Sequence, residues 1–239
     1  PLLFIKLIPN IITLLALIIG MSSIKFAIEQ KWEISVTCIV ISAILDGLDG
    51  RIARILNATS IFGAELDSLA DFVNFGVSPS IIMYLWIFSS FEPAMFSWGI
   101  VLLYTSCMAI RLARFNTTIT DNVTTNFFLG VPAPVGALLV LVPLMIELNL
   151  AQIYKFTIKD YIIYIMLYNV IISLLLSSRV PTISFKKLHI KPEFLWASMC
   201  ISSLIIILLI MYPWYILPIA AVIYIASIPL LAIYLKRLN

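Results

Sequence analysis

The sequence predicts an all-α polytopic membrane protein with about eight transmembrane helices, and three observations support this fold class. The mean hydropathy is +1.11, and only 11% of the residues are charged, whereas a soluble domain carries roughly a quarter. The apolar runs are separated by charged residues at intervals that suit spans of about 20 residues. All five tryptophans lie near predicted helix ends, as in an aromatic belt at a membrane interface.

The first apolar run opens with residues 1–8, which are expected to form a separate short helix at the membrane interface. A span then runs over 9–24, because a proline at position 9 suits the first turn of a helix. No small-residue cleavage signature follows, so this span is expected to be retained rather than removed as a signal peptide. The charges and apolar runs predict seven further spans, at 32–54, 63–88, 93–113, 130–148, 161–176, 194–211 and 215–235.

We expect a single integral-membrane domain over 1–239, with a six-helix core at 1–178 and an additional helix pair at 194–235. If the eight spans alternate in direction, all 15 basic residues fall on one side of the membrane except Lys25, Lys31, Lys155 and Lys159. The positive-inside rule then predicts an inner-membrane protein with both ends of this sequence facing the cytoplasm. The segment between the second and third spans faces the cytoplasm as well.

That segment and its flanks, from position 46 to 71, hold five of the 12 acidic residues of the chain. Charge near a bilayer is costly, so carboxylates there are a functional-site hypothesis. Asp46 and Asp49 are three residues apart at the end of the second span, and Asp67 and Asp71 are four apart at the start of the third. Each pair therefore shares one helical face. If the two helices are neighbours, the four carboxylates converge.

Four converging carboxylates repel one another unless cations balance them, and all-oxygen ligand sets favour Mg²⁺, Mn²⁺ or Ca²⁺. Two metals bridged by carboxylates clamp phosphates during displacement at phosphorus. Gly50, Ala53 and Gly63 leave room for a ligand near the backbone, although small residues also favour close helix packing. The guanidinium group of Arg54 can bind a phosphate through two parallel hydrogen bonds. The segment therefore predicts a metal-dependent pyrophosphate site at the cytoplasmic membrane surface.

A cation-coupled transporter is the alternative, because intramembrane aspartates also serve transport. Transporters tend to bind near the bilayer midplane with broken helices and internal repeats. Here the acids lie at span ends and no repeat is visible. A zinc or haem site has almost no ligands, since the chain holds one histidine and its three cysteines lie in apolar runs.

The spacing of the charged and small residues resembles the signature of the CDP-alcohol phosphotransferases. In this chain the signature is written Asp46-x-x-Asp49-Gly50-x-x-Ala53-Arg54, followed after eight residues by Gly63-x-x-x-Asp67-x-x-x-Asp71. The resemblance extends over residues 9–149. The segments DSLADFVNFGVSPS, RLARFN and FFLGVPAPVGA are similar to the membrane-bound phosphatidylserine synthases of this family, whereas relatives that use glycerol phosphate more often show DPxADK.

The resemblance implies transfer of a phosphatidyl group from CDP-diacylglycerol to L-serine with release of CMP. The alternatives within the family are glycerol phosphate, inositol phosphate or choline as the acceptor. By position, the first of two divalent cations, Mg²⁺ or Mn²⁺, would bind Asp46, Asp49 and Asp67, and the second Asp46, Asp67 and Asp71. Asp71 would also be the general base. The resemblance further implies a homodimer.

The resemblance also implies, by position, which residues bind the substrates. CDP-diacylglycerol would be contacted by Gly50, Ala53, Arg54, Ser60 and Gly63, and from the first span by Asn10 and Thr13, although these two also suit an ordinary helix start. A serine pocket must meet a carboxylate and an ammonium group. Arg111 and Arg114, at the cytoplasmic end of the fourth span, are candidates for contacts to serine or to the diphosphate, or else simple positive-inside anchors.

Overall fold

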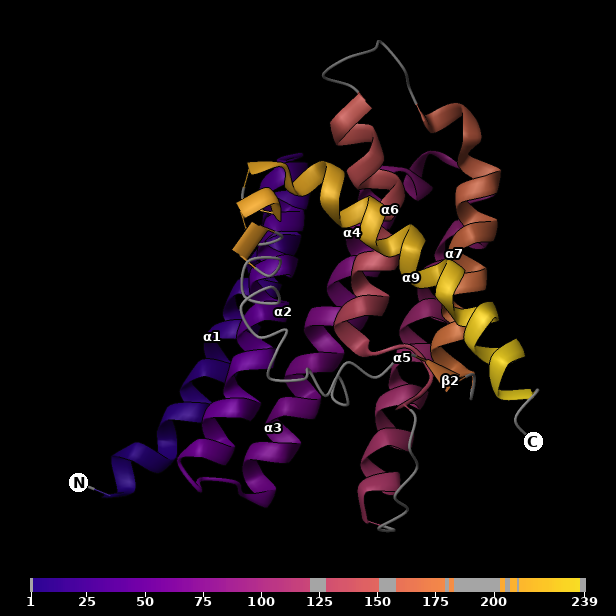
Figure 1. Ribbon diagram of the computed structural model, residues 1–239. Helices are drawn as coiled ribbons and strands as arrows, with labels where there is room; N and C mark the ends of the chain where they lie inside the picture. Colours follow the sequence, from indigo (N-terminus) through magenta and orange to yellow (C-terminus); the bar gives the residue numbers. More distant parts are fainter. Residues whose placement is uncertain are drawn as a thin grey trace.

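The structure, a computed structural model, describes residues 2–120, 128–150, 158–178, 181–182, 203–204, 207–209 and 211–236. Its long helices are α1 (Leu2–Ile28), α2 (Trp32–Ile55), α5 (Ala94–Thr120), α6 (Ala133–Leu150), α7 (Ile162–Ser177) and α9 (Pro213–Lys236). One more helical span is assembled from α3 (Ile61–Asp71), the π-helix η1 (Phe72–Val77) and α4 (Ser78–Trp86). Figure 1 shows these helices as a bundle, with α9 inclined across α6 and α7.

Several helices of the described part of the chain have the length and composition of membrane spans. Four are long and apolar enough to cross a membrane, namely Leu7–Ile28, Ile61–Trp86, Ala94–Thr117 and Ala133–Leu150. Ile162–Ser177 and Pro213–Pro229 are shorter apolar helices. The structure therefore confirms the prediction of an all-α polytopic membrane protein. The predicted span at 194–211 lies mostly outside the described residues.

Helix α1 differs from the prediction, because the expected separate helix over residues 1–8 does not exist. Residues 2–28 form one continuous helix with Pro9 inside it. A proline removes one backbone donor from the helix, but the remaining backbone groups still need partners in an apolar environment, and this favours continuing the helix. The prediction gave too much weight to the proline as a helix start.

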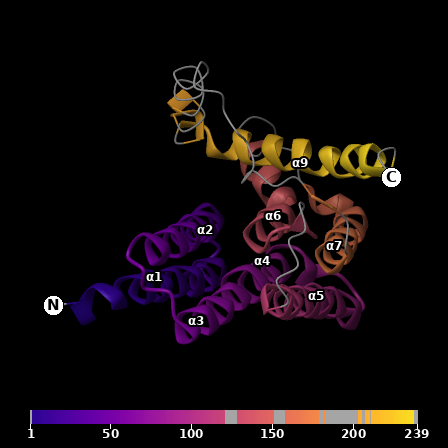
Figure 2. The same ribbon diagram turned by 60° about the horizontal axis from the view of Figure 1, so that its bottom comes forward.

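Helices α1 and α2 form an antiparallel pair on one side of the bundle (Figure 2). Serine hydroxyls join them, since Ser35 Oγ donates to Ser23 O at 2.8 Å and Ser42 Oγ donates to Ala16 O at 3.1 Å. Small residues and such polar contacts are what bring membrane helices close together, because lipid supplies no hydrophobic drive between them. This pairing places the end of α2 beside the first half of α1.

The span over 61–86 is interrupted by a turn of π-helix directly after Asp71. A π-helical turn leaves backbone carbonyls without their usual partners. Here Tyr104 of α5 donates its hydroxyl to Phe75 O at 2.8 Å, and both residues are fully buried. The turn therefore fastens the end of α3 to α5 in the middle of the bundle.

The remaining elements close the bundle around a core of η1, α4, α5 and α6. Side chains there with essentially no exposure include Phe75, Ile82, Met83, Met108, Leu139 and Leu144. The 3₁₀ turns η2 (Phe88–Ser90) and η3 (Ile158–Tyr161) precede α5 and α7. The two-residue strands β1 (Phe128–Leu129) and β2 (Pro181–Thr182) pair antiparallel. Helix α5 continues to Thr120, beyond the predicted end of its span at 113.

The contact between α1 and η1 gives a stability prediction. A Cβ added at Gly20 would lie 2.0 Å from Asn74 Oδ1 and 2.5 Å from Asn74 Cγ, so the buried Asn74 side chain or one of the two elements must shift. We expect Gly20→Ala to destabilise the protein by about 1–3 kcal/mol, as overpacking does. Thermal unfolding of the purified protein in detergent measures the effect as a lowered midpoint.

Gly99→Ala is the matched control, because a Cβ at Gly99 of α5 meets nothing within 4 Å. It is expected to leave the midpoint unchanged or raise it slightly, since alanine is a better helix former by about 1 kcal/mol. Equal shifts for the two variants would contradict the close packing at Gly20.

Candidate active site

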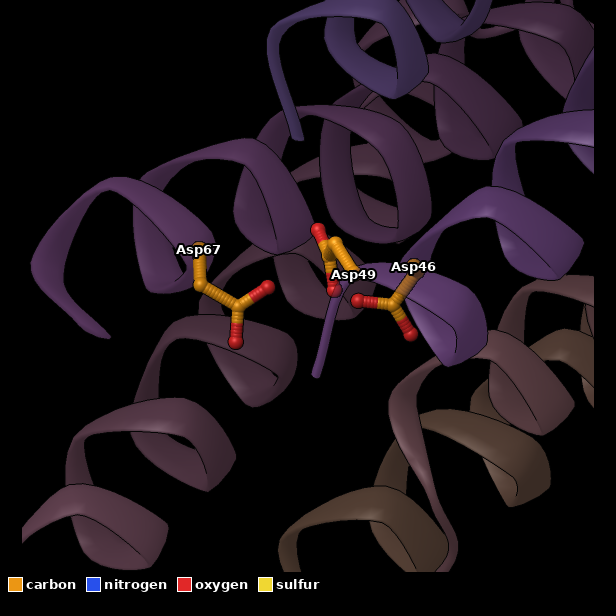
Figure 3. Close-up of side chains that lie close together, drawn as sticks. All are labelled: Asp46, Asp49 and Asp67. Carbon is orange, nitrogen blue, oxygen red and sulfur yellow. The ribbon is translucent and has the colours of Figure 1, made fainter. Parts of the chain in front are cut away.

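The carboxylates of α2 and α3 converge as the helical spacing predicts. Asp46 and Asp49 come from the last turns of α2, and Asp67 comes from α3. One oxygen from each of these three carboxylates lies within 4.8 Å of the others. Figure 3 shows the three side chains pointing toward one another from their helices.

Asp71 joins this cluster through Asp46. The Asp46 carboxylate lies within hydrogen-bonding reach of the carboxylates of both Asp67 and Asp71. Asp71 is the last residue of α3, so the π-helical turn that follows anchors the backbone directly beside it. Asp46 is thus the central member of the four.

The chemistry of this donor set fits a hard divalent cation. Every candidate ligand atom is a carboxylate oxygen, and Asp49 is buried while Asp46 and Asp67 are half-buried. Burying several negative charges side by side is costly without a compensating cation. Carboxylate oxygens are the ligands that Mg²⁺ and Mn²⁺ prefer. The residues present therefore suit the divalent metal that the sequence predicts.

Thr13 of α1 holds Asp49 in place. Its Oγ1 donates to Asp49 Oδ2 at 2.6 Å, and the exposed fractions of the two residues are only 5% and 4%. Hydrogen bonds of this kind orient carboxylates that bind metals. The sequence suggested Thr13 only as a nucleotide contact. The pairing with Asp49 was missed because contact between α1 and the end of α2 cannot be seen in the sequence.

A pocket of about 320 Å³ opens beside the aspartates, between α1, α2 and the first half of α3. Its lining contains all seven residues that the sequence assigns to CDP-diacylglycerol: Asn10, Thr13, Gly50, Ala53, Arg54, Ser60 and Gly63. Asp49 and Asp67 form part of the same wall. The structure therefore brings the predicted binding residues into one cavity that adjoins the aspartate cluster. Asp46, Asp71 and the two candidate arginines of α5 do not line it.

The start of α3 forms one end of this pocket. Ser60 is the N-cap residue, and its hydroxyl accepts a hydrogen bond from Gly63 N at 3.0 Å. The N-terminus of a helix attracts anions, because its backbone N–H groups and dipole present positive charge. Arg54 also lines the pocket, and its Nε donates to Gly50 O at 2.9 Å, which fixes the base of its guanidinium. Both features suit a diphosphate.

The two glycines of the predicted binding set have different surroundings. A Cβ at Gly50 would meet nothing within 4 Å, so this position simply leaves the pocket open. A Cβ at Gly63 would lie 2.9 Å from Asn10 Oδ1 and 3.1 Å from Ser60 Oγ. Gly63 therefore lets the start of α3 approach α1 closely.

If the pocket takes CDP-diacylglycerol, as the resemblance implies, Gly63→Ala is expected to raise the KM for this substrate about 3- to 10-fold, equivalent to about 1 kcal/mol of lost binding. The added methyl group displaces the Asn10 side chain from the pocket wall, whereas the aspartates stay in place. Steady-state kinetics with varied CDP-diacylglycerol measure the change. Gly99→Ala serves again as the control, and an unaltered KM in Gly63→Ala would remove Asn10 from the binding set.

The two candidate arginines of α5 occupy different places. Arg111 is close enough to Asp71 and Asp46 to interact with them electrostatically, and its Nε donates to Val131 O ahead of α6. Arg114 instead donates through Nη1 to Ser177 O at 2.8 Å, at the end of α7. Of the two, Arg111 stands beside the aspartate cluster, and Arg114 ties α5 to α7.

Comparison with known proteins shows which family the chain belongs to. A family model described as CDP-alcohol phosphatidyltransferase matches residues 6–175, and one described as CDP-alcohol phosphatidyltransferase 2 matches residues 201–229. A CDP-diacylglycerol–serine O-phosphatidyltransferase of Mycobacterium leprae is 34% identical over 228 residues, covering 94% of this chain and 74% of the relative.

Proteins of the same name from two other organisms are also similar. The Helicobacter pylori protein is 37% identical over 182 residues, which cover 76% of this chain and 73% of the relative. The Methanocaldococcus jannaschii protein is 37% identical over 134 residues, covering 55% and 57%. The family model spans far more than half of the sequence and includes every aspartate of the cluster. The chain belongs to the CDP-alcohol phosphatidyltransferase family.

Proposed function

We propose that this protein transfers the phosphatidyl group of CDP-diacylglycerol to L-serine, giving phosphatidylserine and CMP. The observation that carries the proposal is the cluster of aspartates from α2 and α3 at the wall of the pocket. Relatives named as CDP-diacylglycerol–serine O-phosphatidyltransferases match 94% and 76% of the chain, and they support serine as the acceptor. Family membership leaves the transporter alternative without support.

The aspartates are the proposed metal ligands. Asp46, Asp49 and Asp67 would hold one divalent cation, and Asp46, Asp67 and Asp71 a second, with Mg²⁺ or Mn²⁺ as the ion. When bound, such cations neutralise charge that develops on the diphosphate during displacement at phosphorus. Thr13 keeps Asp49 oriented for this task through its 2.6 Å hydrogen bond.

Asp71 is the proposed general base. As the serine hydroxyl oxygen forms a bond to the β-phosphorus, Asp71 takes the hydroxyl proton, and the bond between that phosphorus and the CMP oxygen breaks. A general base has to lie next to the reacting hydroxyl. Asp71 lies at the edge of the cluster outside the pocket, next to Arg111. Arg111 is the proposed partner for the serine carboxylate.

The pocket is the proposed site of the CDP moiety. Asn10 and Thr13 would contact the nucleotide from α1, and Arg54 would hold the diphosphate, for which a guanidinium can form two parallel hydrogen bonds. The N-terminus of α3, capped by Ser60, adds backbone donors to the same pocket. Gly50 and Ala53 also line the pocket, and their small size leaves room for the ligand.

The placement in the cell is part of the proposal. The protein is an integral membrane protein, and we place it in the inner membrane with the active site and both ends of this sequence facing the cytoplasm, as the distribution of basic residues supports. Residues 1–178 would form the catalytic core and 194–235 an added helix pair. A homodimer, which the family resemblance implies, is tested by the mass of the particle in detergent.

Exchanging the acceptor tests the proposed function. Purified protein is given CDP-diacylglycerol and Mn²⁺ or Mg²⁺, and CMP release is measured with serine, glycerol phosphate, inositol phosphate or choline. We expect release with serine to exceed release with every other acceptor. Release that depends on another alcohol would keep the reaction class and overturn serine as the acceptor.

A further inference from the structure

A hydrogen bond between α3 and α5 lies next to the aspartates and has no part in the mechanism described so far. Asn116 Nδ2 donates to Ser68 Oγ at 2.9 Å, and the Ser68 hydroxyl lies 3.3 Å from Asn116 Oδ1. Both residues are half-buried. The contact joins two helices whose residues are 48 positions apart in the sequence.

The two partners of this bond stand beside functional residues. Ser68 follows Asp67 directly and precedes Asp71 by three positions, so Ser68 and Asp71 are neighbours on the surface of α3. Asn116 is on the same helix as Arg111, which interacts electrostatically with Asp71. The hydrogen bond therefore connects α3, which carries the proposed base Asp71, to α5, which carries Arg111.

The bond also lies outside the nucleotide pocket, because neither Ser68 nor Asn116 lines it. The pocket is lined by α1, α2 and the start of α3, and by no residue of α5. In Figures 1 and 2, α3 lies between the α1–α2 pair and α5. In displacement at phosphorus the attacking and leaving oxygens are roughly in line, on opposite sides of the phosphorus. With CMP leaving into the pocket, the acceptor oxygen enters from the α5 side.

We propose that Ser68 and Asn116 are positioning residues of the acceptor site, whose hydrogen bond holds α5 against α3 so that Arg111 and Asp71 face the same acceptor molecule. The acceptor class is a small alcohol that carries a carboxylate, which Arg111 receives while Asp71 faces its hydroxyl. The inference rests on the proposed function. It adds a pair of residues that sets acceptor affinity and leaves CDP-diacylglycerol binding unaffected.

Steady-state kinetics test the pair, with serine varied at saturating CDP-diacylglycerol and then the reverse. Ser68→Ala and Asn116→Ala are each expected to raise the KM for serine about 5- to 10-fold, the scale of one hydrogen bond, with the KM for CDP-diacylglycerol within about twofold. The double variant is expected to match the single variants rather than multiply them, because each substitution already breaks the same bond. Ser68→Thr, which keeps a hydroxyl, is expected to stay near the wild type.

Thr117→Ala is the matched control, since it removes a hydroxyl next to Asn116 on the same helix, one that donates to Arg114 O at 2.9 Å. A merely structural role would lower the active fraction, and hence kcat, without moving the KM for serine. An unaltered serine KM, an equal rise in both KM values, or a multiplicative double variant would each overturn the proposal. CMP release by the wild-type protein with serine is measured first. If serine supports no release, the proposed function itself is refuted. In that case the KM values of the variants are compared for the acceptor that does support release.

Discussion

Replacing Asp71 by asparagine is expected to lower turnover by about 10²- to 10⁴-fold, the usual contribution of a general base. Asparagine keeps the size of the side chain but cannot take a proton from the acceptor hydroxyl. Because Asp71 does not line the nucleotide pocket, and the proposed cation at Asp46, Asp49 and Asp67 keeps all three ligands, binding of CDP-diacylglycerol at saturating Mn²⁺ is expected to stay within about threefold of the wild type. CMP release and equilibrium binding of CDP-diacylglycerol, measured on the same preparation, separate the two effects.

Glu65→Gln is the control for this experiment. It removes one negative charge from the same helix, but Glu65 is exposed and lies outside both the aspartate cluster and the pocket lining. Turnover of this variant is expected to be close to that of the wild type. Near-normal turnover of Asp71→Asn would show that another group accepts the proton.

The second large effect is expected at Asp46. Its carboxylate lies within reach of those of Asp67 and Asp71 and belongs to the compact cluster with Asp49, so it contributes to both proposed metal positions. Asp46→Asn should reduce activity by about 100-fold or more at low Mn²⁺ and raise the Mn²⁺ concentration for half-maximal activity at least about 10-fold, since losing even a supporting group of a metal site costs about 10- to 100-fold. Titration with Mn²⁺ at saturating substrates measures both quantities, and metal binding to the protein alone gives a second readout.

Glu33→Gln provides the comparison on the same helix. Glu33 is exposed in the first turn of α2, at the end opposite the cluster. The metal dependence of this variant is expected to equal that of the wild type. If Asp46→Asn also kept the wild-type metal dependence, the cluster would not be the metal site.

The helices could be predicted from the sequence because apolar length and charge position determine where a chain can cross a bilayer. The bounds of α2 match the prediction closely, since charged residues mark both of its ends. Two features were not predictable. The continuity of α1 through Pro9 depends on how its backbone groups are satisfied, and the π-helical turn after Asp71 contacts Tyr104, which lies on another helix.

Convergence of the aspartates could be predicted because spacings of three and four residues place side chains on one face of a helix. The partners of these side chains could not, because they come from helices far away in the sequence. Thr13 reaches Asp49 from α1, and Asn116 reaches Ser68 from α5. Arg111 and Arg114 are equivalent as a sequence pattern, and only packing assigns the first to the aspartates and the second to α7.

The stoichiometry of one reaction tests phosphatidyl transfer at the aspartate cluster most directly. Purified protein is incubated with CDP-diacylglycerol, labelled L-serine and Mn²⁺, and labelled lipid and free CMP are both quantified, with and without a chelator. We predict one molecule of labelled phosphatidylserine for each CMP released, and neither product when the chelator is present. Labelled lipid without CMP, or CMP release that is independent of serine and of the divalent cation, would contradict phosphatidyl transfer at the aspartate cluster.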